Sequence, residues 1–227
     1  MRIAIVGGTG DEGFGLAIRL AAAGVEVTIG SRALDRAEDA AKRVKEAAGA
    51  DVPVAGAENA EAVANADLVF VTVPYAGQAD TYRSLKEHWP EGVIVCDTTT
   101  PLASAVGGRA TQVLRPWHGS AAEQARALLP KGTRLVSGFH SVGAEPLTHL
   151  AEPMEADALL CGDDQEAKEV VGALVERIAG MRWIDCGRLE MARVLEPITA
   201  TLITVNKKYG IKGAGIRFSG RDTWGSP

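Results

Sequence analysis

A glycine motif near the N-terminus is the part of this sequence whose chemistry is clearest. Residues 8–13 read Gly-Thr-Gly-Asp-Glu-Gly and follow the apolar run from Arg2 to Val6. In this pattern Gly8 permits a tight turn, Gly10 lets the backbone approach a pyrophosphate, and Gly13 lets a helix pack closely on a strand. The free N–H groups at the start of that helix then face the phosphates. The context of strand, glycines and helix favours dinucleotide binding over a glycine turn that binds no nucleotide.

The residues after the second expected strand bear on which dinucleotide is bound. NAD-binding versions usually carry Asp or Glu about 20 residues after the glycines, where it bonds the ribose 2′-hydroxyl. Here that position is Gly30, followed by Ser31 and Arg32, with Arg36 four residues later. Guanidinium groups donate to a 2′-phosphate and neutralise it. The spacing favours NADP over NAD; the alternative is that Ser31 caps a helix and both arginines are only solvated.

The elements that must position these residues alternate between strand and helix. Strands are expected at 2–6, 25–29, 52–55, 67–73, 93–96, 134–137, 158–160 and 182–184, and helices at 14–23, 31–48, 59–65, 78–88, 120–128, 164–178 and 189–208, the last bent at Pro197. This alternation predicts an α/β fold with a Rossmann-type doubly wound parallel sheet. We expect an NADP-binding domain over residues 1–150 and a small helical and extended C-terminal unit over 151–227, packed on it.

Composition narrows the class of protein. The 227 residues carry 24 Lys+Arg and 29 Asp+Glu, a net charge of −5 that argues against nucleic acid as the main partner. No apolar run approaches the ~20 residues of a membrane helix, so no membrane partner is expected. Three cysteines without a CxxC pair favour a reducing, cytoplasmic setting over a disulfide framework or a zinc ribbon. The spacing of the four histidines predicts no metal site.

Further candidate residues follow other expected strands, where doubly wound sheets bind their ligands. Pro74 and Tyr75 would border the nicotinamide, or else form a rigid strand-to-helix turn. For the threonines at 98–100 a role in satisfying turn backbone is favoured. His140 follows the strand at 134–137 and is the best functional histidine, with a structural imidazole nearly as good an interpretation.

Several of these motifs also occur together in one known family. They are the glycine motif extended through 15–21 as Gly-Leu-Ala-x-Arg-Leu-Ala, then Gly30-Ser31-Arg32, Asp67 with Pro74, Val136-Ser137 with His140, Cys-Gly-Asp-Asp at 161–164, and Gly215-Ile216 with Phe218. In these residues the chain resembles the deazaflavin-dependent NADP reductases, over nearly its whole length. The resemblance implies an oxidoreductase that exchanges a hydride between NADP(H) and coenzyme F-420, an 8-hydroxy-5-deazaflavin.

The resemblance also implies roles for particular residues. Thr9 and the amides of Gly10, Asp11 and Glu12 would hold the pyrophosphate, and Ser31, Arg32 and Arg36 the 2′-phosphate. The nicotinamide would lie beside Val73, Pro74, Tyr75 and Ala144, and the deazaflavin beside His140, Ser141, Val142 and Ala214. A homodimer is implied, with the C-terminal helix as the expected contact. The segments 103–119 and 220–227 match the family poorly.

Direct hydride transfer between stacked rings needs no metal and no covalent nucleophile. No obligatory acid or base is therefore named; His140 is the candidate for polarising the deazaflavin ring. Two further classes stay open from the residues themselves. One is another NADP-linked reductase, acting on an imine or carbonyl like the pyrroline-carboxylate reductases, or on ferric iron through a flavin. The other is a regulator that senses NADP without catalysis.

Overall fold

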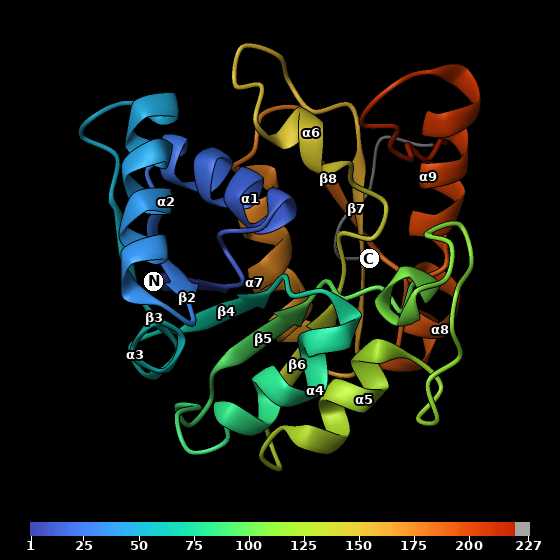
Figure 1. Ribbon diagram of the computed structural model, residues 1–227, viewed down its shortest axis with the longest axis horizontal. Coiled ribbons are helices and arrows are strands. Elements are labelled where there is room, and N and C mark those ends of the chain that lie inside the picture. Colours follow the sequence, from blue (N-terminus) through green and yellow to red (C-terminus); the bar gives the residue numbers. More distant parts are fainter. Residues whose placement is uncertain (221–227) are drawn as a thin grey trace.

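The computed structural model describes residues 1–220, which form one central sheet with helices packed around it (Figure 1). Its strands are β1 (Arg2–Val6), β2 (Glu26–Ser31), β3 (Val54–Glu58), β4 (Leu68–Val71), β5 (Ile94–Asp97), β6 (Arg134–Ser137), β7 (Asp157–Gly162) and β8 (Arg182–Asp185). Their order across the sheet is β3-β2-β1-β4-β5-β6-β7-β8. The predicted Rossmann-type doubly wound sheet is confirmed, with one antiparallel pair, β6 and β7, among parallel ones.

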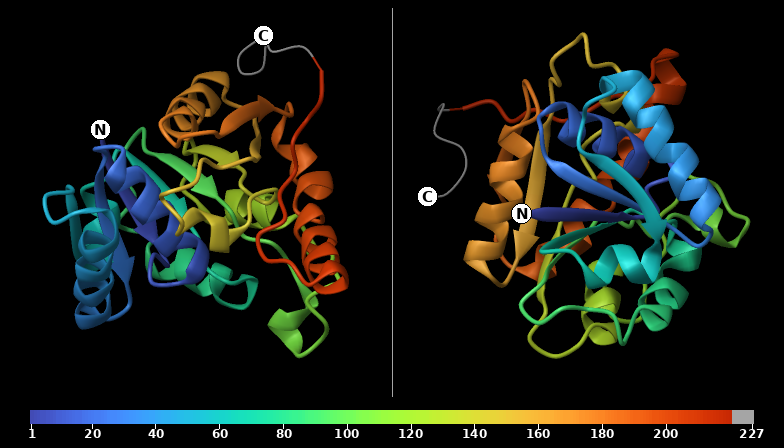
Figure 2. Two further views of the ribbon diagram at one scale, coloured as in Figure 1. Left: turned by 90° about the horizontal axis from the view of Figure 1, so that it is seen from above. Right: turned by 90° about the vertical axis from the view of Figure 1, so that its left-hand side faces the viewer.

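Helices cover both faces of the sheet (Figure 2). They are α1 (Asp11–Ala22), α2 (Leu34–Ala48), α3 (Asn59–Ala64), α4 (Tyr75–Ser84), α5 (Ala121–Leu128), α6 (Ala144–Leu147), α7 (Gln165–Glu176), α8 (Ala192–Leu195) and α9 (Ile198–Tyr209), with 3-10 turns η1 (Ala103–Val106) and η2 (Leu189–Met191). α1, α2 and α7 share a core on one face. α3, α4 and α5 share the core on the other.

β1 illustrates how the sheet is buried on both sides. Ile3 and Ile5 pack into the core beneath α1, whereas Ala4 and Val6 pack into the core beneath α3 and α4. Successive residues of a strand point to opposite faces, so a strand covered on both faces must be apolar throughout. The run of apolar residues that predicted this strand is therefore a direct consequence of its central place in the sheet.

The antiparallel pairing of β6 and β7 has a consequence for the carboxyl edge of the sheet. A parallel neighbour would require a crossover back to the opposite edge. Instead, residues 138–156 leave β6 and enter β7 at the same edge, forming a long turn that contains α6. The segment that carries His140 and Ala144 therefore lies entirely at the edge where ligands bind in such sheets.

Several predicted helix boundaries are wrong, among them that of the helix expected at 78–88, which is α4 at Tyr75–Ser84. Ser31 does not cap α2, because β2 continues pairing with β3 through Ser31 and the N-cap is Ala33. α1 begins at Asp11 rather than Phe14, so the helix starts inside the glycine motif. The bend expected at Pro197 is confirmed: η2 and α8 precede it and α9 follows it, since proline lacks the N–H that a continuous helix needs.

The chain after residue 150 extends the sheet at one edge. It contributes β7, α7 and β8, and then α9, which stands beside the carboxyl edge (Figure 1). The division into units at 1–150 and 151–227 stays a prediction, and residues 221–227 lie outside the described part of the chain.

Asp157, at the start of β7, anchors the segment that follows α9. Its buried carboxylate accepts two hydrogen bonds from Arg182, at 2.7 and 2.8 Å, and one from the Phe218 N–H at 2.6 Å. Its own N–H donates to the carbonyl of Ile216 at 2.8 Å. These contacts hold the segment after α9 against β7, as its return path in Figure 2 shows.

We predict that Asp157→Ala lowers the free energy of unfolding by about 2–3 kcal/mol, because it removes a fully buried carboxylate and the three hydrogen bonds that this carboxylate accepts from Arg182 and the Phe218 N–H. Denaturant unfolding measures this change. The control is Asp80→Ala, which removes an exposed pair with Arg83 and should cost less than about 1 kcal/mol. Equal, small losses in both variants would contradict the anchoring role.

Candidate functional site

The loop between β1 and α1 leaves the first turn of α1 without a cap. Gly10 is the N-cap residue, and no side chain caps the helix there. The first intrahelical bond runs from the Phe14 N–H to the Gly10 carbonyl, at 2.8 Å. The amides of Asp11, Glu12 and Gly13 have no acceptor among residues 1–220. Such amides, at the positive end of a helix, are an anion-binding arrangement.

The glycines of this loop have separate reasons to be glycine. The positive φ of the turn, +82°, falls on Gly7 and not on Gly8, which corrects the role expected for Gly8. A Cβ on Gly13 would lie 2.4 Å from Thr72 Oγ1, so only glycine lets α1 pack this closely on the end of β4. A Cβ on Gly10 would meet nothing nearer than the Gly7 carbonyl at 3.4 Å, so the space in front of it is open.

Two arginines lie beside this loop with unpaired side chains. β2 ends next to β1, with Gly30 opposite Val6, which brings Ser31 and Arg32 to the same edge as the first turn of α1. Arg32 and Arg36 are exposed, and neither has an ion pair or hydrogen bond within the part of the chain that the structure describes. Unpaired guanidinium groups beside uncapped amides are suited to a ligand with several phosphates.

The residues that follow β4 border the loop on its other side. The Thr72 hydroxyl donates to the Val6 carbonyl at 3.1 Å, and a Cβ on Gly7 would lie 2.9 Å from Val73 Cγ1. Pro74 is the N-cap residue of α4 and Tyr75 its first residue. The Tyr75 hydroxyl hydrogen-bonds Gln124 of α5 at 3.2 Å. Val73 thus contacts the glycine loop, while the Tyr75 hydroxyl is already engaged.

His140 is a buried histidine without a hydrogen-bond partner at either ring nitrogen among the described residues. Burial lowers its pKa to about 4, and the nearby Thr99 backbone opposes that shift without cancelling it. The imidazole is therefore neutral at neutral pH. A buried polar group without a partner is costly, and in native proteins such a group usually has a ligand, water or role to account for it.

The other residues expected beside the deazaflavin gather around the same turn. Ser141 donates to the Asp157 carbonyl at 2.6 Å, so its hydroxyl supports β7 rather than facing a ligand. Val142 is buried. The Ala214 N–H donates to Asn206 of α9 at 2.9 Å, and a Cβ on Gly143 would lie 2.7 Å from the Gly213 Cα. These glycine contacts bring Ala144 and Ala214, 70 residues apart in sequence, to one place.

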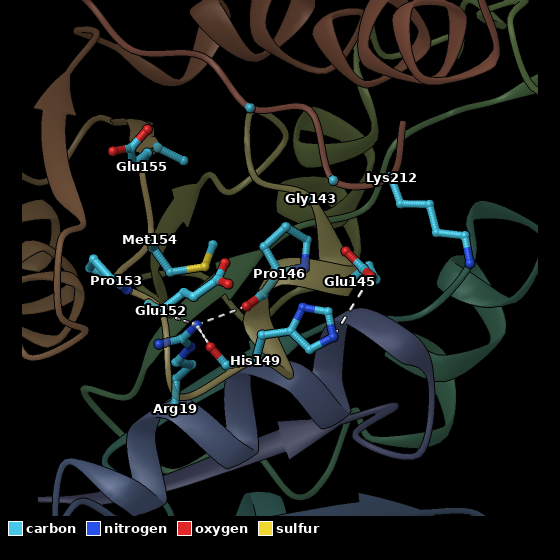
Figure 3. Close-up of a pocket in the computed structure, with 13 residues that line it drawn as sticks. Arg19, Gly143, Glu145, Pro146, His149, Glu152, Pro153, Met154, Glu155 and Lys212 are labelled. Atoms are coloured by element: carbon cyan, nitrogen blue, oxygen red, sulfur yellow. Dashed lines mark hydrogen bonds and ion pairs between the residues drawn. The ribbon is translucent and has the colours of Figure 1, made fainter. Parts of the chain in front are cut away.

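Two cavities adjoin this turn. One, of about 630 Å³, opens between the first turn of α1, α6 and the end of α9; its lining includes Asp11, Phe14, Arg43, Ala144, Asn206 and Lys212. The other, of about 410 Å³, lies beside Arg19, whose guanidinium points at backbone carbonyls of the turn (Figure 3). Arg19 donates to the carbonyls of Pro146, Leu147, His149 and Glu152. The second cavity is thus bordered by a structural arginine.

A row of polar residues at three-residue spacing fixes α8 and α9 to this edge. Arg193 pairs with Glu123, and the Glu196 carboxylate accepts the N–H groups of Ala121 and Ala122, both at 2.9 Å. Thr199 donates to the His140 carbonyl at 3.0 Å. Burial raises the pKa of Glu196 to about 8, opposed by the two amide donors. Sequence reasoning did not find these residues, because their partners are distant in the chain.

A second buried carboxylate lies under the end of β5. Asp97 accepts hydrogen bonds from Tyr82 at 2.7 Å, from Gln78 at 3.0 Å and from the Thr99 N–H at 2.9 Å. Burial raises the pKa of Asp97, and these donors oppose the rise. A single Asp at the end of an apolar run was the only signal for it in the sequence.

Residues 1–220 contain no metal-ligand cluster, no disulfide and no membrane-spanning helix. No group of three or more His, Cys, Asp and Glu side chains there could hold a metal ion. All three cysteines are free. No helix in that part is long and apolar enough to cross a membrane.

Comparison with known proteins gives three kinds of similarity. Residues 2–101 match the family model described as NADP oxidoreductase coenzyme F420-dependent. The chain is 44% identical to an F420-dependent NADP reductase of Methanothermobacter thermautotrophicus, over 96% of this chain and 95% of that one. It is 45% identical to an F420-dependent NADP reductase of Methanocaldococcus jannaschii, over 96% and 98%.

A solved structure from an Arthrobacter species aligns with a TM-score of 0.74 at 24% identity, over 97% of this chain and 100% of that one, and supports the fold. Identity near 45% over almost the full length of both chains goes further than a shared fold. This chain belongs to the family of F420-dependent NADP reductases.

Proposed function

We infer that this protein is an NADP-dependent oxidoreductase that transfers a hydride between NADPH and the deazaflavin coenzyme F420. The observation that carries the NADP half is the uncapped first turn of α1 beside Arg32 and Arg36, whose side chains have no partner among residues 1–220. The deazaflavin half rests on family membership, since the curated relatives are F420-dependent NADP reductases. Both coenzymes are co-substrates, and each carries two electrons as a hydride.

We assign the NADP(H) site to the edge formed by β1, β2 and β4. The pyrophosphate fits the amides of Asp11 and Glu12, because these lack acceptors among residues 1–220. The Gly10 N–H, also expected to bind it, already donates to the Gly7 carbonyl at 2.9 Å, so Gly10 contributes the open space in front of it. Thr9 belongs to the same loop. The 2′-phosphate fits Ser31, Arg32 and Arg36. The nicotinamide then falls towards Val73, Pro74, Tyr75 and Ala144, at the ends of β4 and of the 138–156 turn.

We assign the deazaflavin to the side of the cleft formed by His140, Ser141, Val142 and Ala214. The unpartnered imidazole of His140 supports this, since a ring with donors and acceptors lying against it would satisfy a buried polar group. The 630 Å³ cavity beside Ala144 offers room next to that position. Ser141 contributes through its place in the turn, because its hydroxyl is bound to β7.

With the two coenzymes assigned in this way, the protein catalyses hydride transfer mainly by positioning their rings. Hydride donor and acceptor carbons must approach to about 3–3.5 Å in aligned geometry, which rigid elements achieve better than mobile side chains. The uncapped helix and the arginines fix one ring, and the turn held by Thr199, Arg19 and the Asp157 carbonyl fixes the other. His140 is neutral, so it can orient the deazaflavin by hydrogen bonding but adds no charge.

We also propose a cytoplasmic homodimer. Free cysteines suit a reducing compartment. Val194, Tyr209 and Ile211, in or next to the C-terminal helices, expose apolar side chains that a second copy could cover.

The function is tested by anaerobic mixing of the purified protein with NADPH and oxidised coenzyme F420, following loss of the deazaflavin absorbance. Rapid bleaching with NADPH, slow bleaching with NADH and none when FMN replaces the deazaflavin are expected. Binding of NADPH without any bleaching would overturn the proposed activity and leave a regulator or another reductase.

Removing either free arginine should weaken NADPH binding selectively. We predict that Arg32→Ala and Arg36→Ala each raise the Kd of NADPH ten- to a hundredfold, since a charged hydrogen bond contributes about 1.5–3 kcal/mol. The Kd of NADH should change little. Fluorescence titration measures both, with Arg83→Ala, an exposed arginine of α4, as the control. An equal rise in Kd for NADPH and NADH would show that the arginines do not contact the 2′-phosphate, which only NADPH carries.

His140→Ala should separate the two half-sites. We predict a fall of about tenfold in kcat/KM for the deazaflavin, the value of one hydrogen bond of about 1.4 kcal/mol, while the Kd of NADPH stays within about twofold. Steady-state kinetics and NADPH titration measure the two effects. His88→Ala, at an exposed position, serves as control. Unchanged deazaflavin kinetics would remove His140 from the site.

A further inference from the structure

Glu12 reaches from the glycine loop to the end of a distant strand. It is the second residue of α1 and is only partly accessible. Its Oε2 accepts a hydrogen bond from the Thr98 hydroxyl at 3.2 Å, directly after β5. In the sheet, β5 and β2 lie on opposite sides of β1. Arg32 and Arg36 follow β2, so they lie on the side away from Thr98. If the arginines hold the 2′-phosphate, the Glu12 carboxyl lies towards the nicotinamide half of the cofactor.

The surroundings of this carboxyl disfavour its ionised form. Asp97 lies immediately before Thr98, and burial and the negative charge of Asp97 both act against ionisation of Glu12. Together they raise its pKa to about 8, although the Thr98 hydrogen bond opposes the rise. No lysine, arginine or histidine forms an ion pair with Glu12 in the described part of the chain.

The elements around Glu12 supply few other groups that could change charge. β5 contributes Cys96, whose thiol pKa burial raises well above the usual value. The end of β4 contributes the uncharged Thr72 and Val73, and the turn after β6 contributes His140, which is neutral above pH 5. Asp11 shares the first turn of α1 but is exposed.

An ionised Glu12 would conflict with the ligand that its own helix is built to hold. The amides of Asp11 and Glu12 are the proposed donors to the pyrophosphate, which carries negative charge. A carboxylate in the same turn, partly shielded from water, would repel those phosphates at close range. A protonated carboxyl removes the repulsion and gains an O–H donor that the carboxylate lacks.

We propose that the Glu12 carboxyl must hold a proton when NADP(H) occupies the cleft, so that cofactor binding is coupled to proton uptake at this one residue. The proposal rests on the proposed function, because it needs the dinucleotide at the first turn of α1. The protonated carboxyl then acts as a neutral hydrogen-bonding group beside the nicotinamide half, and it becomes a source of repulsion as the pH rises.

The expected size of the effect follows from the fraction of Glu12 that is protonated in the free protein. With a pKa of about 8, that fraction falls from about nine tenths at pH 7 to about one tenth at pH 9. The apparent Kd is the intrinsic Kd divided by the competent fraction. NADPH binding should therefore be about tenfold weaker at pH 9 than at pH 7, with uptake of about half a proton per NADPH at pH 8.

The test is titration calorimetry of NADPH into the protein at pH 7, 8 and 9, each in two buffers of different ionisation enthalpy. The buffer dependence at pH 8 reports the protons taken up by the wild type and needs no variant. Glu12→Gln, which keeps the shape and cannot ionise, should bind with nearly the same Kd at all three pH values and take up no proton. The matched control is Glu61→Gln, an exposed carboxylate in the first turn of α3, which should behave as the wild type.

Each outcome decides between the proposals. A wild type that binds NADPH with equal affinity at pH 7 and 9, or a Glu12→Gln variant that keeps the wild-type proton uptake, would overturn the role of Glu12 and leave the NADP site intact. A folded wild type that does not bind NADPH at any pH would overturn the proposed function itself.

Discussion

The close packing of α1 on the ends of β1 and β4 is the constraint on which the candidate site depends. Gly13 allows this approach, since a Cβ there would collide with the Thr72 hydroxyl. The approach directs the first turn of α1, with no side-chain cap, to the carboxyl edge of the sheet. A helix start that is closely packed yet short of acceptors is stable only where water or an anion completes its hydrogen bonds. The arginines after β2 lie on one side of this turn, and the Glu12 side chain reaches from it to Thr98 on the other.

The deazaflavin half of the candidate site depends on a different feature, the antiparallel pairing of β7 with β6. It keeps residues 138–156 at the same edge as the glycine loop, so one turn can lie opposite the cofactor. The turn has little regular structure of its own and is held from outside, by Arg19 on one side and by Thr199 on the other. The row formed by Arg193, Glu196 and Thr199 therefore couples the position of α9 to that of His140.

Much of this arrangement could be predicted from the sequence because its signals are local. The glycine motif and the residues after β2 are recognised from short stretches of neighbouring residues, and the buried strands are visible in the sequence as apolar runs. The prediction that Ser31 caps a helix was wrong, because the pairing of β2 with β3 extends through Ser31 and no local sequence pattern indicates that pairing. The contacts of Asp97 with Tyr82, of Glu196 with Ala121 and of Glu12 with Thr98 could not be predicted, since they join residues 15 to 86 positions apart. The charge states of these three carboxyls follow from burial, which only the folded chain defines.

The central claim, direct hydride transfer between two rings held at this edge, is tested most directly by isotope tracing. NADPH deuterated at either face of C4 would be mixed anaerobically with oxidised coenzyme F420 and the protein in ordinary water, and the reduced deazaflavin analysed by mass spectrometry. The account predicts that the deuterium from one of the two faces appears in the deazaflavin, because donor and acceptor carbons are held in one alignment. Loss of the deuterium to water, or its delivery from both faces equally, would contradict a site that fixes the two rings against each other.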